Sequence, residues 1–227
     1  MPRTIFTSRV GGVSSPPYDD FNLALHVGDD VEKVIANRRR LAENFGLVMK
    51  NLVFMEQVHG RQVAVINETS EASKPPVADA LFTMNPDIAL VVLTADCIPM
   101  LLCADEAVAA VHVGRKGLVA GIIQATIATF NSFGITNNKI RAELGPAICG
   151  DCYEVDLDLY REVVSNIPAT ATDESIHRLD IVAGARDILK QFGVDSQSSV
   201  DCTHHSPGYF SYRRDGLTGR QCGAIRL

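Results

Sequence analysis

Residues 88–113 read IALVVLTADCIPMLLCADEAVAAVHV, and this stretch decides the fold class. Its apolar runs, Ile88–Leu93, Met100–Cys103 and Ala107–Val113, are short and are separated by breaks that contain aspartate. Short apolar runs bounded by polar or turn-forming residues predict β-strands rather than helices. The stretch therefore predicts several neighbouring strands at the centre of the protein.

Sequence on either side of this stretch adds further strands and four helices. Similar apolar runs predict strands at Leu52–Met55, Arg61–Ile66, Ala80–Phe82 and Ile140–Leu144. Apolar residues at helical spacing predict helices over Asp30–Phe45, Val119–Phe130, Leu157–Val164 and Ile181–Phe192, the last capped near Asp180. The tail from Ser199 reads as strand and loop. Since no repeat or low-complexity linker divides the chain, we expect one α/β domain over residues 1–227, with mixed β-sheets and helices on their faces.

Composition narrows the class of function. The 227 residues are 46% hydrophobic and 21% charged, as in ordinary globular proteins, and carry a net charge of −6. A negative balance argues against a broad surface for nucleic acid or anionic membranes. Ile88–Leu93 is far shorter than the roughly 18 apolar residues that cross a bilayer. With no signal-peptide pattern in the first residues, we expect a cytoplasmic protein.

Three residues at the ends of predicted strands offer metal-binding atoms. They are His59 in QVHG, Cys97 in TADCIP and His112 in AVHVG. Two imidazoles and one thiolate form the ligand set of a catalytic zinc site, in which the fourth position stays open to water or substrate. The sequence separations do not show that the three side chains meet, so buried histidines and a buried cysteine with backbone hydrogen bonds are an equally good interpretation. A third interpretation is a metal-free cysteine hydrolase, in which Cys97 attacks and His112 acts as the base.

The other cysteines and histidines carry weaker signals. Cys149-Gly-Asp-Cys152 has the spacing of a redox pair or of half a zinc site, but without a second Cys pair we favour two thiols in a loop. Cys103 lies in an apolar run and is expected in the core, whereas Cys202 and Cys222 have no clear role. His204 and His205 are adjacent, so only one of them could serve a given site.

Two short basic segments are candidates for anion binding. Arg213 and Arg214 follow aromatic residues near the C-terminus, and planar guanidinium groups can grip phosphate or carboxylate with two hydrogen bonds. Arg115 and Lys116 open the predicted helix after His112, where backbone N–H groups could also hold an anion.

These motifs, taken together, resemble the YfiH-type laccase-domain family, whose members are also called polyphenol oxidases or purine nucleoside phosphorylases. The matching blocks run in order along the chain and are TSRVGGVS (7–14), PY (17–18), NL (22–23), HVGD (26–29), QVHG (57–60), ADA (78–80), TADCIP (94–99), GPAI (145–148), CYEV (152–155), FSYRRDG (210–216) and TGR (218–220).

The resemblance implies a four-layer α/β/β/α fold and one metal site formed by His59, Cys97 and His112. It also implies phosphorolysis of adenosine, inosine and methylthioadenosine, an adenosine deaminase side activity and a copper-dependent oxidation of phenols. The chain has too few ligand clusters for the several coppers of a true laccase, so phenol oxidation would come from one copper in the same open site. Zinc there would instead polarise a substrate oxygen or lower the pKa of a water to about 7.

For the nucleoside reactions we expect Arg9, Asn22, Lys116, Arg213 and Arg214 to contact substrate or phosphate, and Asp96 or Glu56 to carry protons. We expect a monomer or homodimer. The chain departs from the family at HVGRKG (112–117), where the family commonly has HAGWRG. Arg115 replaces a tryptophan and Lys116 replaces an arginine, which keeps the positive charge but removes an aromatic platform.

Overall fold

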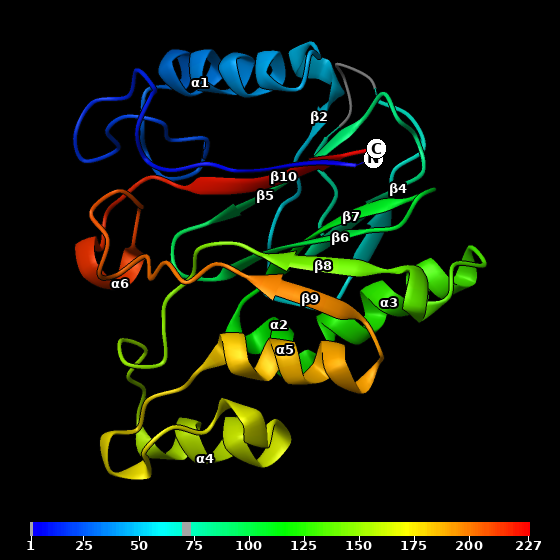
Figure 1. The fold of residues 1–227 in the computed structure, drawn as a ribbon. Helices are drawn as coiled ribbons and strands as arrows, with labels where there is room; N and C mark the ends of the chain where they lie inside the picture. The colour runs from blue at the N-terminus through cyan, green and yellow to red at the C-terminus, as the bar shows by residue number, and fades with distance from the viewer. Residues whose placement is uncertain (1, 70–73) are drawn as a thin grey trace.

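The computed structural model describes residues 2–69 and 74–227, in which two β-sheets lie face to face between layers of helices (Figure 1). The strands are β1 (Arg3–Phe6), β2 (Leu52–Val53), β3 (Val63–Val65), β4 (Ala80–Thr83), β5 (Ala89–Thr94), β6 (Ile98–Cys103), β7 (Val108–Val113), β8 (Arg141–Leu144), β9 (Asp195–Ser198) and β10 (Gln221–Arg226). The α-helices are α1 (Val31–Asn44), α2 (Arg115–Ala120), α3 (Ile122–Ser132), α4 (Leu157–Asn166), α5 (Ile181–Gln191) and α6 (Tyr212–Asp215).

The two sheets are mixed and differ in size. The smaller has the strand order β1-β10-β5-β2 and the larger has the order β3-β4-β7-β6-β8-β9. β5 and β6 are consecutive but belong to different sheets, so the chain crosses between the sheets at residues 95–97. This crossing carries Cys97. The central strands β5, β6 and β7 are buried along their whole length, as the apolar sequence of residues 88–113 requires.

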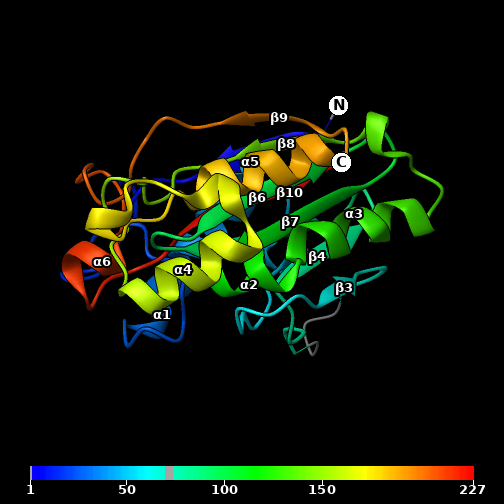
Figure 2. The same ribbon diagram turned by 90° about the horizontal axis from the view of Figure 1, so that it is seen from below.

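Three apolar clusters separate the layers. One fills the space between α1 and the smaller sheet, with Leu41, Phe45 and Val91 among its members. A second lies between the two sheets and includes Leu90 and Leu101. The third packs the larger sheet against α2, α3 and α5, which cover its outer face in Figure 2, while α4 lies farther out. Because each sheet is apolar on both faces, the layers stack in the order α/β/β/α, which confirms the expected fold.

Most predicted elements are present, with local differences. The predicted helix over Val119–Phe130 is instead two helices, α2 and α3, because Gly121 adopts a left-handed conformation with φ of 88° and breaks the run. β1 and β9 were not predicted, since neither has a clear apolar alternation. β1 pairs antiparallel with β10, which places the two ends of the chain side by side. Within the described ranges, no helix has the length and apolarity that a membrane crossing needs.

Candidate metal centre and substrate cavity

His59, Cys97 and His112 meet at one end of the two sheets. His59 lies in the loop between β2 and β3, Cys97 directly precedes β6, and His112 lies in β7. β6 and β7 pair antiparallel, with Pro99 opposite His112, which brings the thiol and the imidazole to the same sheet edge. The two imidazole rings stand edge to face, with centroids 4.7 Å apart. Strand pairing therefore joins two of the candidates, and the loop after β2 supplies the third.

The geometry of these three side chains fits a metal ion. One ligand atom from each residue lies within 4.8 Å of the others. A tetrahedral zinc with bonds of about 2.0–2.3 Å places its ligand atoms roughly 3.3–3.8 Å apart, so only a small inward movement is needed. No further His, Cys, Asp or Glu of the described residues belongs to this group, which leaves a coordination position for substrate. All three ligands line one cavity, so that position faces open space.

Asp79 holds two of the three ligands in place, and the sequence analysis did not identify it. Its fully buried carboxylate accepts hydrogen bonds from Nδ1 of His112 at 2.8 Å and from the backbone N–H groups of His59 and Gly60 at 2.9 and 2.6 Å. Because the carboxylate takes the proton on Nδ1, Nε2 of His112 is left as the metal-binding atom. The ADA block at residues 78–80 was a signal for this residue, but its role depends on contacts across the sheet.

The same contacts set the charges of the site. Burial alone would raise the pKa of the Cys97 thiol, but the hydrogen bonds and positive charge of His112 and His59 outweigh it and lower the pKa to about 6. Burial would lower the pKa of His112, but hydrogen bonds to Asp79 and Cys97 raise it to about 9. Burial likewise opposes, but hydrogen bonds from His112 and Gly60 produce, a lowered pKa for Asp79. At neutral pH the metal-free site is thus a thiolate beside an imidazolium, and the thiolate is the form that binds metals.

This charge state predicts how metal-free protein reacts with iodoacetamide. Only the thiolate reacts, so labelling of Cys97 should be near its maximum at pH 7 and should decrease as the pH falls through about 6, instead of through the ordinary value of 9.0. Cys222, whose pKa burial raises to about 12, is the internal control and should stay unlabelled. Peptide mapping after labelling at a series of pH values measures both sites. Labelling of Cys97 that decreases already below pH 9 would contradict the geometry.

Two backbone features keep the site open and fixed. A methyl group added at Gly114 would lie 3.0 Å from both Sγ of Cys97 and Cδ2 of His59, so glycine leaves the two ligands the room they occupy. Asp96 has φ of 107°, a conformation that favours glycine. Its carboxylate accepts hydrogen bonds from Thr203 Oγ1 and from the backbone N–H of Arg213, each at 2.7 Å. Asp96 therefore fixes the segment that carries Cys97 against the C-terminal segment.

The metal centre opens into a cavity of about 820 Å³. Aromatic side chains of Phe54, Tyr153 and Tyr212 line it, together with Glu56 and Gln57. A cavity of this size holds a ligand of nucleoside dimensions, since small-molecule sites commonly measure 300–1,000 Å³ by rough estimate. These aromatics provide the flat surfaces that the replacement of tryptophan by Arg115 removes from the motif after His112.

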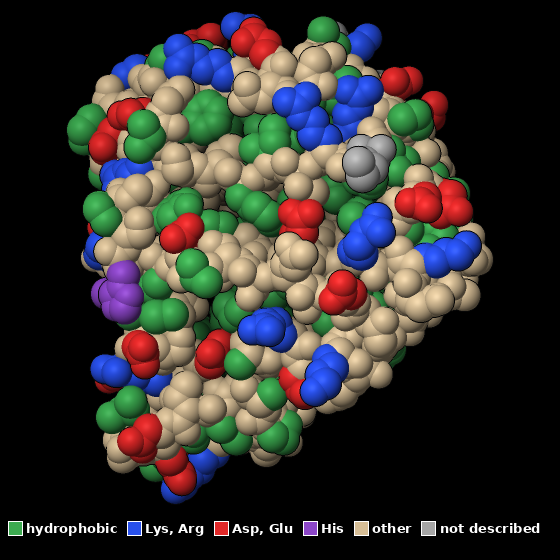
Figure 3. Space-filling model, in the orientation of Figure 1, with side chains coloured by type: hydrophobic (Ala, Val, Ile, Leu, Met, Phe, Trp, Pro, Cys, Tyr) green, Lys and Arg blue, Asp and Glu red, His purple; other side chains and the backbone are tan. Residues whose placement is uncertain are grey.

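One part of the cavity wall is strongly cationic. Arg38, Arg115, Arg213 and Arg220 line it with His26. Burial lowers the pKa of Arg38 to about 10, so it remains charged at neutral pH. Burial and the charges of Arg220 and Arg38 lower the pKa of His26, so this imidazole is neutral there. On the outer face shown in Figure 3, by contrast, basic and acidic side chains are interspersed among the coloured residues.

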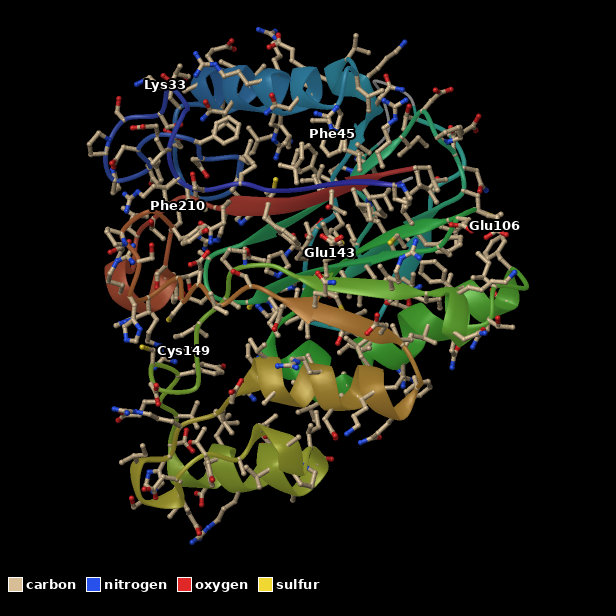
Figure 4. The ribbon with its side chains drawn as sticks, in the orientation of Figure 1. Lys33, Phe45, Glu106, Glu143, Cys149 and Phe210 are labelled. Atoms are coloured by element: carbon tan, nitrogen blue, oxygen red, sulfur yellow. The ribbon has the colours of Figure 1, made fainter. Side chains whose placement is uncertain are left out.

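Of the five residues expected to contact substrate, only Arg213 lines the cavity. Arg9 donates hydrogen bonds to the backbone and side chain of Asp19 and lies over the ring of Phe210, labelled in Figure 4. Asn22 is fully buried and bonds to Asp29 and to the backbone N–H of Arg220. The structure therefore places Arg9 and Asn22 as supports for the surrounding loops rather than at the cavity.

Lys116 and Arg214 are also outside the cavity wall. Lys116 is exposed on α2, whereas its neighbour Arg115 faces the cavity. Arg214 donates hydrogen bonds to the carbonyl oxygens of Thr203, Ser206 and Tyr209 and pairs with Asp215 at 2.8 Å, so its donors are occupied by the protein itself. Sequence could not separate these neighbours, because a local basic pair does not show which side chain faces inward.

Comparison with known proteins extends over nearly the whole chain. The family model for multi-copper polyphenol oxidoreductase laccase matches residues 3–227. A purine nucleoside phosphorylase of Streptomyces griseus is 43% identical over 228 residues, which cover 98% of this chain and 93% of that protein. The purine nucleoside phosphorylase YfiH of Escherichia coli is 39% identical over 230 residues, covering 97% and 92%.

Solved structures show the same fold. A crystal structure of a Neisseria meningitidis protein matches with a TM-score of 0.89 and 37% identity, covering 100% of this chain and 94% of that one. YlmD from Geobacillus stearothermophilus matches with a TM-score of 0.89 and 31% identity, covering 99% and 91%. The four-layer arrangement is thus shared with experimentally determined structures.

Proposed function

This chain belongs to the YfiH-type laccase-domain family, and from that premise we propose that it is a zinc-dependent purine nucleoside phosphorylase acting on adenosine, inosine and methylthioadenosine. One observation carries the proposal: His59, Cys97 and His112 converge at the wall of a cavity of about 820 Å³ that also contains arginine and aromatic side chains. Metal, anion and purine could each find matching chemistry there. The relatives named purine nucleoside phosphorylases support this assignment.

In phosphorolysis a phosphate oxygen bonds to C1′ of the ribose while the glycosidic bond breaks, and the purine leaves with the electron pair and takes up a proton. Zinc held by the three ligands would supply Lewis-acid polarisation of a substrate oxygen. The guanidinium groups of Arg115 and Arg213 would hold the phosphate anion, and Tyr153 and Phe54 would stack against the base. Glu56 lines the cavity from an exposed position and is our candidate for the proton carrier.

We extend the proposal to two side activities. Deamination of adenosine needs a water at C6 and a proton carrier for the leaving ammonia, and Glu56 or Asp96 could serve. Both oxygens of Asp96 already accept hydrogen bonds, which favours Glu56. Copper in place of zinc on the same three ligands is the proposed source of any polyphenol oxidation. The protein would act in the cytoplasm, as a monomer or homodimer.

Product analysis tests the main activity. Zinc-loaded protein incubated with adenosine and phosphate should release adenine and ribose 1-phosphate, and no adenine should appear when phosphate is omitted. Inosine formed without phosphate would identify deamination as the main reaction instead. Neither product from the zinc-loaded protein would contradict the proposal. Parallel incubation of copper-loaded protein with a phenol tests the oxidase activity separately.

The metal-free cysteine hydrolase gains one supporting observation from the structure. Cys97, His112 and Asp79 are linked in the order of a nucleophile, a base and an orienting carboxylate. Ready alkylation of Cys97 does not separate the two functions, because the metal-free form of either would react. Metal content does: purified protein without stoichiometric zinc or copper would favour the hydrolase, and a bound equivalent would favour the phosphorylase.

Arg213→Ala is expected to raise the phosphate concentration needed for half-maximal phosphorolysis. Arg213 lies over the ring of Tyr153, with its guanidinium carbon 5.2 Å from the centroid, and it lines the cavity. Loss of a hydrogen bond to a charged group costs about 1.5–3 kcal/mol, which corresponds to at least a tenfold change. Initial rates against phosphate concentration measure it. Lys116→Ala removes an exposed cation beside the cavity and is the control; a shift in that variant alone would move the anion site to Lys116.

A further inference from the structure

Four metal-binding side chains meet outside the cavity, and the proposed function does not use them. They are Cys149, Cys152, Cys202 and His205, whose ligand atoms all lie within 4.8 Å of one another. Sγ of Cys152 is 3.0 Å from Nε2 of His205. Two come from the loop after β8 and two from the segment before α6. Cys149, labelled in Figure 4, lies on the loop below α6.

Backbone hydrogen bonds build this cluster from two turns. In the first, the N–H groups of Cys152 and Tyr153 donate to the carbonyl oxygen of Cys149 at 3.1 and 3.2 Å. In the second, the N–H of Ser206 donates to the carbonyl oxygen of Cys202 at 3.0 Å. The N–H of Cys149 also donates to Sγ of Cys202 at 3.4 Å, which joins the turns. The four side chains are thus directed to one point by the backbone of both segments.

We propose that these four residues bind a structural zinc ion. Three thiolates and one imidazole are a ligand set of structural zinc sites, which are closed by four protein ligands. Sulfur atoms on a tetrahedral zinc lie about 3.8 Å apart, so the observed arrangement needs little adjustment. None of the four lines the cavity, and Cys202 is buried. The site therefore differs from the His59, Cys97 and His112 centre, which keeps a position open to substrate.

This assignment reverses our expectation for the Cys149-Gly-Asp-Cys152 motif. A second Cys pair is absent from the sequence, but Cys202 and His205 take its place in three dimensions. The bridge between Ala147 and Cys202 brings the distant segment alongside the loop. His204, the neighbour of His205, is outside the group, so only one of the adjacent histidines takes part.

The zinc would fasten one wall of the cavity. Tyr153 follows Cys152 directly and lines the cavity, as does Arg213 from the other segment. Arg213 donates a hydrogen bond to the carbonyl oxygen of Glu154 at 2.8 Å, so the two segments also meet at the cavity itself. A metal between Cys152 and His205 would hold these two cavity residues in register without contacting substrate.

Zinc analysis of protein purified under reducing conditions tests the site. We expect two zinc ions per chain in the unchanged protein and one in the Cys149→Ser, Cys152→Ser double variant. The control Cys103→Ser, a change of the same kind in β6, should keep both ions. Cys97→Ser should also keep one, and the cobalt form of that variant should show the strong thiolate absorption bands of a centre with several sulfur ligands.

A pair of single histidine variants tests the fourth ligand without removing a buried group. His205→Ala should release one zinc to a chelator at least tenfold faster than the unchanged protein, and His204→Ala should release it at the unchanged rate. The exposed position of His205 makes misfolding of that variant improbable on physical grounds. A Cys97→Ser variant that holds no zinc, equal release from both histidine variants, or a Cys149–Cys152 disulfide in the reduced preparation would overturn the proposal.

Discussion

Cys97→Ser is expected to remove the metal of the cavity site and the phosphorolysis activity together. A neutral hydroxyl is a far poorer zinc ligand than a thiolate, and the pKa of the Cys97 thiol, about 6, shows that the surrounding histidines stabilise the thiolate form. Activity should fall to the background of the assay, and metal content should fall by one ion per chain. Both are measured on the same preparation, by product analysis and by metal analysis.

Cys103→Ser is the matched control for this variant. Cys103 is buried at the other end of β6, and burial raises the pKa of its thiol, so it has no place in a metal site. It should retain both metal and activity. Full metal content in Cys97→Ser would exclude Cys97 from the ligand set, and full activity without the metal would exclude the zinc-dependent reaction.

Asp79→Asn is expected to weaken metal binding at the cavity site by about 10- to 100-fold, the range typical of carboxylates that orient a metal-binding histidine. The carboxylate accepts from His112 and from the backbone N–H groups of His59 and Gly60. An amide loses the negative charge and turns one N–H₂ group toward donors, so the imidazole would no longer be held in one orientation. Competition with a chelator of known affinity measures the change.

Asp105→Asn provides the comparison for Asp79→Asn. The Asp105 side chain is 91% exposed and its contact with Arg141 is 4.0 Å long, so the same chemical change there should leave metal affinity unaltered. Equal affinity in the Asp79 and Asp105 variants would show that the buried carboxylate does not position His112.

Much of the fold could be predicted from local sequence. The apolar runs of residues 88–113 predicted three strands, and structure places β5, β6 and β7 there. Asp180 was expected to cap a helix, and its carboxylate accepts from the backbone N–H of Ala183 at the start of α5. Local patterns succeed here because strand and helix formation depends on neighbouring residues. They failed for β1, whose place is fixed by pairing with β10 at the other end of the chain.

The candidate site divides in the same way. Residue types singled out His59, Cys97 and His112, because few side chains bind transition metals and these lie at strand ends. Sequence spacing did not distinguish Arg213 from Arg214, although one lines the cavity and the other binds backbone carbonyl groups. Orientation toward a cavity depends on packing of the whole segment, and this information is absent from a local pattern.

The sequence by itself determined the class of fold, the family and the set of side chains able to bind a metal, since these follow from residue chemistry and local periodicity. Only the tertiary structure decided which of those side chains share a point in space. It joined Cys97 to His112 through the pairing of β6 with β7, and it joined Cys149 to Cys202 through a backbone hydrogen bond. The physical reason is that metal coordination requires atoms within a few ångströms, whereas the chain brings together residues that are distant in sequence only after its sheets have formed.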